Sequence, residues 1–172
     1  MTDLTKKPLV RLIEALNNRN PNTALSLIDL AVTTPVVNND VLHNTRVVIT
    51  PLPNVTTLKN KRTIFYNRLN LQTVFTQRGI TNIDPGVATN THELLPLILA
   101  QTNILLEPVD IVLANLNTPP YVLQATLTSY GWLGQVSLNE NTGTTVRVFV
   151  LDNGDVFGLD NDSVLAIDDE VI

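Results

Sequence analysis

Residues 62–75 (RTIFYNRLNLQTVF) most constrain the fold, because the hydrophobic period changes within them. Ile64 and Tyr66 alternate as in a β-strand, whereas the apolar residues after Asn70 follow helical spacing. The Asn67 and Asn70 side chains can hydrogen-bond the backbone where the strand becomes a helix. We therefore predict that a strand ends near Tyr66 and that Asn70 caps a short helix extending to about residue 77.

A charged residue, Arg68, lies at the centre of this junction. Tyr66 and Leu69 on either side are suited to anchoring the end of a central strand. Two outcomes are open for Arg68: its guanidinium reaches a carboxylate or the carbonyls of a neighbouring turn, or it is exposed to solvent. The structural junction is defined here by six residues: Tyr66, Asn67, Arg68, Leu69, Asn70 and Trp132.

Other periodic segments indicate both helices and strands. We predict a small antiparallel or mixed sheet with about three short helices, which is an α+β fold. The expected helices are one capped by Thr5 that continues past Leu16, one over residues 70–77, one opened by the capping box Asn90-x-x-Glu93, and a short piece over 108–116. Strands are expected at residues 45–50, 63–67, 121–129 and 135–138. Residues 24–32 are ambiguous between strand and helix, and a strand is favoured.

The last part of the chain has a strong hairpin signal. Asn153-Gly154 is the dipeptide preferred in two-residue hairpin turns, and it separates the β-rich residues 144–152 from 155–159. The segment SVLAIDDEVI at the end is typical of one further strand. We therefore expect an α+β module over residues 1–139 and a C-terminal β extension over 140–172. This extension packs on the module or on a neighbouring subunit.

The composition bounds the class of protein. A chain of 172 residues is the size of one domain, and only 16% of them are charged, so that uncharged Asn and Thr must cover much of the surface. The absence of cysteine excludes disulfides and thiolate chemistry. No apolar run is long enough to cross a bilayer or to serve as a signal peptide. We expect no membrane association.

No catalytic constellation is visible in the sequence. None of the serines lies in a Gly-x-Ser-x-Gly turn, and there is no glycine-rich phosphate loop. His43 and His92 are far apart in the sequence, so they do not suggest a shared site. Glu107 and Asp110 are more simply explained as acidic residues in the first turn of a helix, where the helix dipole favours negative charge. We predict that the protein is not an enzyme and has no catalytic residues, metal site or cofactor.

Four acidic residues near the C-terminus, Asp152, Asp155, Asp160 and Asp162, suggest a possible calcium site. Their spacing is not that of an EF-hand loop, which needs glycine at its sixth position and a bidentate Glu at its twelfth, where Ser163 lies here. The pattern favours solvated turn carboxylates, with an adventitious cation site as the alternative.

The charges are unevenly distributed along the chain. Residues 1–78 contain ten basic and four acidic side chains, a net charge of +6, whereas residues 79–172 contain one and twelve, a net charge of −11. The two parts either neutralise each other within one domain or form faces through which copies meet. Lys59, Lys61 and Arg62 form a basic patch too small for nucleic-acid binding, so we expect it, with the four C-terminal aspartates, to contact protein.

The order of several segments carries a family resemblance. The segments are HNTRVVIT, TIFYNRLNLQTVF, NTHELLPLILAQTNILLEPVDIV and YVLQATLTSYGWLGQVSL. Over residues 9–138 this order resembles a module of structural proteins of large contractile-tailed bacteriophages. In that module a YNR-x-(D/N)L turn precedes T-H-x-L-L-P, L-x-x-x-D-I and A-x-x-S-x-x-W-x-G segments.

The resemblance implies a non-enzymatic virion protein that contacts other virion proteins and copies of itself, as a homo-oligomer within a larger assembly. A place in the tail, baseplate or neck is slightly favoured over capsid decoration. A different class is also open, a soluble carbohydrate- or cell-surface-binding module. Trp132, Tyr130 and Tyr121 would then form a stacking platform, although such aromatic residues more often belong to a core.

Overall fold

The computed structural model describes residues 3–21, 24–56, 58 and 60–141, together with the backbone of residues 149–150 and 156–157. The described chain is an α+β protein, as predicted, with three α-helices and several small sheets. It consists of two compact units, Met1–Glu140 and Asn141–Ile172, and each is described by itself.

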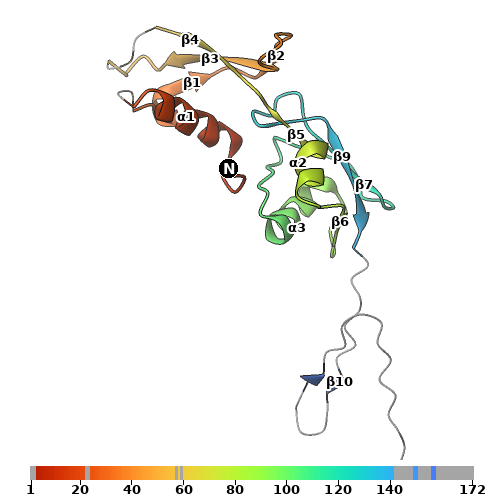
Figure 1. The fold of residues 1–172 in the computed structure, drawn as a ribbon. Coiled ribbons are helices and arrows are strands. Elements are labelled where there is room, and N and C mark those ends of the chain that lie inside the picture. The colour runs from red at the N-terminus through yellow and green to blue at the C-terminus, as the bar shows by residue number, and fades with distance from the viewer. Residues whose placement is uncertain are drawn as a thin grey trace, which may run out of the picture. The chain divides into compact units, whose positions relative to one another are not determined.

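The first unit contains all three of the described α-helices (Figure 1). Its elements in chain order are α1 (Pro8–Arg19), the 3₁₀-helix η1 (Leu27–Asp29), β1 (Leu30–Val32), β2 (Val36–Val37), β3 (Thr45–Pro51), β4 (Arg62–Tyr66), β5 (Leu69–Asn70), α2 (Leu71–Gln77), β6 (Asn82–Ile83), α3 (Thr91–Thr102), β7 (Tyr121–Gln124), β8 (Trp132–Leu133) and β9 (Gln135–Glu140).

The first sheet is built around β3. β1 and β2 pair with successive parts of one edge of β3, and β4 pairs with its other edge, all antiparallel. β3 and β4 confirm the strands predicted at residues 45–50 and 63–67. Thr45, Val47 and Ile49 are buried on one side of β3, which is the side that α1 covers in Figure 1. The opposite side of this sheet is covered by no other described element.

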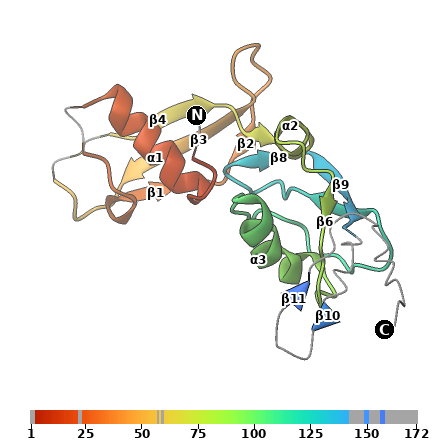
Figure 2. The same cartoon turned by 60° about the horizontal axis from the view of Figure 1, so that its bottom comes forward.

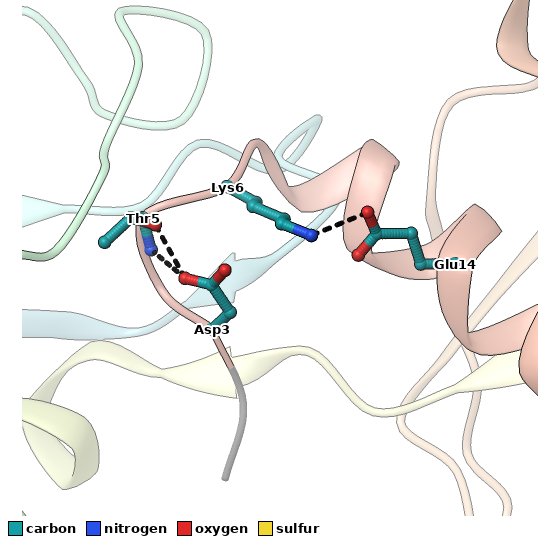
Figure 3. A network of polar contacts seen from close by, with 4 residues as sticks. All are labelled: Asp3, Thr5, Lys6 and Glu14. Carbon is teal, nitrogen blue, oxygen red and sulfur yellow. Dashed lines mark hydrogen bonds and ion pairs between the residues drawn. The ribbon is translucent and has the colours of Figure 1, made fainter.

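The start of α1 differs from the expected cap. Lys7 occupies the N-cap position without a side-chain bond, and Pro8 is at the start of the helix, where its missing N–H has no intrahelical partner. Thr5 instead donates its backbone N–H and its hydroxyl to Asp3 Oδ1, at 3.0 and 2.6 Å (Figure 3). Lys6 Nζ forms an ion pair with Glu14 at 2.8 Å.

A second hydrophobic core contains the buried side chains of α2 and α3 and of the strands next to them. Figure 2 shows these helices beside β6, β8 and β9. The three-stranded sheet β6-β9-β7 and the parallel pair β5-β8 pack with these helices. Trp132, Phe75, Leu94 and Ile98 are completely buried there. None of the described helices has the length and apolar character needed to cross a membrane.

Both predicted caps of the second core are present. Asn70 Oδ1 accepts from Thr73 N at 3.0 Å, and Asn90 Oδ1 accepts from the first-turn N–H groups of α3. Gly79 follows α2 and has a φ of +70°, a conformation that suits glycine at the end of a helix. Pro96 lies inside α3, on the exposed side of the helix.

Three predicted elements are wrong in whole or in part. Residues 121–129 form a strand only at Tyr121–Gln124. Residues 24–32 form a strand only at Leu30–Val32, after the 3₁₀-helix η1. Residues 108–116 are not helical. Residues 108–110 form a turn, and tertiary bridges then pair Ile111 with Ala125 and Asn115 with Asn90. These long-range contacts override a weak local helix signal.

In the second unit, β10 (Phe149–Val150) and β11 (Val156–Phe157) pair antiparallel, as the hairpin prediction requires. Their register pairs Val150 with Val156, whereas a two-residue turn at residues 153–154 would pair Val150 with Phe157, so the predicted register is wrong by one residue. The predicted terminal strand lies outside the described residues.

Close packing between α1 and β8 generates a first prediction. A Cβ added at Gly131 would lie 2.5 Å from Pro8 Cβ and 2.9 Å from Arg11 Nη2, whereas one at Gly79 would meet nothing within 4 Å. We expect Gly131→Ala to lower the free energy of unfolding by about 2–3 kcal/mol, because the first turn of α1 must move.

Gly79→Ala is the matched control, since it carries only the cost of a left-handed conformation, about 1–2 kcal/mol. Urea denaturation of both variants measures the difference. Equal destabilisation by the two substitutions would contradict tight contact between α1 and Gly131.

Candidate functional site

The junction is organised around a buried guanidinium. Arg68 is only 8% exposed, and its Nε donates to Thr45 Oγ1 at 2.9 Å. Its Nη1 donates to the carbonyl oxygens of Leu127 and Ser129, each at 3.2 Å. The prediction that Arg68 reaches the carbonyls of a neighbouring turn is therefore confirmed. Burial lowers the pKa of Arg68 from its ordinary value.

Two asparagines join the junction to the loop between β2 and β3. Asn44 donates its N–H to Asn67 Oδ1 at 2.8 Å and its Nδ2 to Arg68 O at 3.2 Å, while its Oδ1 accepts from Arg68 N at 2.9 Å. Asn67 Nδ2 donates to Leu42 O at 3.0 Å. The Asn67 side chain thus fixes the loop backbone at Leu42 and Asn44, and the Asn44 side chain in turn binds the backbone of Arg68.

Large apolar side chains project from the segments that the junction holds. Val41 is 98% exposed and Leu42 is 70% exposed in the β2–β3 loop, and Leu127 is 84% exposed in the segment whose carbonyl binds Arg68. We call Val41, Leu42 and Leu127 the junction tip. Val41 and Leu42 are adjacent in sequence, and neighbouring exposed apolar side chains are a candidate protein contact surface.

A second buried network lies beside the junction. Ser129 Oγ donates to Asp110 Oδ1 at 2.6 Å and accepts from Trp132 N at 3.0 Å. Asp110 Oδ2 accepts from Glu107 N at 3.1 Å. Burial is the main cause that raises the pKa of Asp110, against the opposing effect of the Ser129 hydrogen bond.

Trp132 is completely buried, and the Arg11 guanidinium carbon lies 5.4 Å from the centre of its ring. This position is typical of a cation–π contact. Trp132 cannot belong to an exposed stacking platform, so that part of the carbohydrate-binding alternative is wrong. Tyr121 is also buried, at 8% exposure.

The network contains a serine next to a carboxylate, but its geometry is structural. Ser129 and Asp110 are 0% and 1% exposed, and the hydroxyl already donates once and accepts from backbone N–H groups. His92 is engaged elsewhere, since its Nε2 donates to Ile111 O at 2.9 Å. No group of three potential metal ligands was found within the described residues.

The residues predicted to make protein contacts are only partly placed. Lys61 and Arg62 are exposed where β4 begins, whereas Lys59 lies outside the described residues. Asp152, Asp155, Asp160 and Asp162 also lie outside them. Their role in contact between copies stays a prediction.

Several functional candidates were missed from the sequence. Asn44 was not singled out, and Asp110 was assigned to a helix start although its carboxylate binds Ser129. The exposed pair Val41-Leu42 could have been noticed, because two adjacent apolar residues follow the polar run Asn38-Asn39-Asp40 in a short loop. The partner of Ser129 had no local signal, since the two residues are 19 positions apart.

The chain belongs to a family of unknown function, DUF7941, which matches residues 1–159. Comparison with curated proteins and with solved structures gave no match. Family membership therefore assigns no activity, and the functional conclusion depends on the geometry described above.

The Arg68 network generates a second prediction. Arg68→Met removes a charged donor from Thr45 Oγ1 and from two carbonyl oxygens, so we expect the free energy of unfolding to fall by about 2–4 kcal/mol. Arg46→Met is the matched control, because Arg46 is exposed on β3 and the change should cost less than about 0.5 kcal/mol. Chemical denaturation provides the measurement, and equal losses in both variants would refute a special role for Arg68.

The raised pKa of Asp110 generates a third prediction. In the folded state this carboxyl keeps its proton to a higher pH than in the unfolded state, so its contribution to stability is greatest at low pH and is lost as pH rises. Relative to Asp110→Asn, the wild type should lose stability from about pH 4 upward through the folded pKa of Asp110, then reach a plateau. Denaturation midpoints of both proteins across this range test it, and parallel curves would show that Asp110 has an ordinary pKa.

Proposed function

We propose that this chain is a non-enzymatic structural component of a tailed-phage virion that acts through protein–protein contact in many copies. The junction tip is the observation that supports contact: three large apolar side chains stand in water on a hydrogen-bonded framework. The virion assignment is supported by the resemblance of residues 9–138 to structural proteins of contractile-tailed phages. A place in the tail, baseplate or neck is slightly preferred over capsid decoration.

The motifs that carry this resemblance are also those that build the framework. Asp110 of the L-x-x-x-D-I segment accepts a hydrogen bond from Ser129 of the S-x-x-W-x-G segment, and Arg68 of the YNR turn donates to the carbonyl of the same serine. This arrangement supports a role for the motifs in holding the fold, which leaves the exposed residues between them to contact partners.

The composition of purified phage particles tests the proposal. Mass spectrometry of purified phage particles should find the chain at many copies per particle, with other virion proteins in the same fraction. Recovery of the chain only from the particle-free lysate would contradict a structural role in the virion.

A surface variant gives the fourth prediction. Replacing Val41 and Leu42 by Ser should reduce incorporation into particles severalfold without lowering the melting temperature, because both side chains are already exposed in the free protein. Val87→Ser is the control, since Val87 is 96% exposed in a different loop. Normal incorporation of the double variant would show that the junction tip is not a contact surface.

A further inference from the structure

The β4 strand has one edge without a partner. Its five residues, Arg62–Tyr66, pair with β3 on one side, and no other strand of the described chain pairs with the other side. Such an edge presents unsatisfied N–H and C=O groups that can take up a further strand. Basic residues mark its start, since Lys61 and Arg62 are exposed and have no ion pair among the described residues.

The sheet face next to this edge is open as well. Arg46 of β3 lies between Val36 of β2 and Phe65 of β4, and all three are exposed on the side opposite α1. Phe65 is 45% exposed, and its ring lies 6.4 Å from that of His43. A hollow of about 310 Å³ on this face is lined by Thr33, Thr34, Val36, Arg46, Val47, Val48 and Thr63.

Arg46 is a free cation at this surface. Within the described part of the chain it has neither a hydrogen bond nor an ion pair, and it is flanked by apolar and threonine side chains. The edge and the face together therefore match an extended segment that combines apolar residues with negative charge.

The chain itself contains a segment of this chemistry. Residues 1–140 have ten basic and nine acidic side chains, a net charge of +1, whereas residues 141–172 have one and seven, a net charge of −6. The final ten residues, SVLAIDDEVI, place three consecutive acids between apolar and β-branched residues. Ten extended residues span about 33 Å, which is longer than the five-residue edge of β4.

We propose that the free edge of β4 binds the acidic C-terminal segment, residues 160–172, of a second copy as an added strand. Main-chain hydrogen bonds complete the edge, and Asp168, Asp169 and Glu170 of one copy meet the cations at Arg46 and Arg62 of the next. Because two different surfaces meet, the contact is heterologous and builds a ring or a helical stack. This inference rests on the proposed function, since it names the partner surface for contact between copies.

The test uses full-length protein and sedimentation velocity at low and high salt. Arg46→Glu combined with Arg62→Glu should weaken self-association at least about tenfold at low ionic strength, where exposed charges interact most strongly. Arg19→Glu is the matched control, because it reverses the charge of an exposed arginine at the end of α1, far from the edge in sequence, and should change association less than about twofold.

Charge exchange provides the decisive variant. By itself, the replacement of Asp168, Asp169 and Glu170 by Lys should weaken self-association. In the Arg46→Glu, Arg62→Glu background, the same replacement should restore it, because the opposite charges face each other again. Weakening by each set without restoration in the combination would overturn the pairing. If a variant does not fold by circular dichroism, excess synthetic peptide of residues 160–172 should instead dissociate wild-type assemblies, and a scrambled peptide should not.

The outcomes separate this inference from the proposed function. Wild-type association that none of these changes affects would overturn the β4 contact, while presence of the chain in particles would still support the structural role. A wild-type chain that stays monomeric at every concentration would also overturn the contact between copies. Absence from purified particles would count against the virion assignment alone.

Discussion

The buried guanidinium of Arg68 is the interaction on which the described fold most depends. A charge removed from water is costly unless its donors are satisfied, and here a hydroxyl and two carbonyls accept from it. These acceptors come from the start of β3 and from the segment before β8, which are far apart in sequence. Arg suits this position because its planar donors reach several acceptors at once, whereas a lysine ammonium on a flexible stem does not.

The first unit has two hydrophobic cores, and the same region joins them. Leu69 pairs in parallel with Trp132, Leu4 belongs to the second core although it precedes α1, and the Tyr130 hydroxyl donates to Val32 O at 3.3 Å. Gly131 allows the first turn of α1 to pack against the backbone beside Trp132. These segments thus contact one another, although they are separated along the chain.

Buried polar residues and exposed residues have different roles in this molecule. Buried polar groups such as Asp110 and Ser129 fix the backbone, while Val41, Leu42 and the β4 edge are exposed and free to meet partners. Surface positions of this kind can change with little effect on stability, because their contacts form only in an assembly. A family defined without a known activity is compatible with this division, and contact with partners is the function that we propose for it.

The sequence by itself determined those elements whose signals are local. The alternation and capping around Asn70 and Asn90, and the β-branched runs of β3 and β4, correctly predicted helices and strands, because hydrophobic period and capping act within a few residues. Only the tertiary structure decided that residues 108–116 are not helical, that Trp132 is buried, and which oxygens accept from Arg68. Those outcomes depend on partners tens of residues away, and no local pattern in one sequence specifies such a pairing.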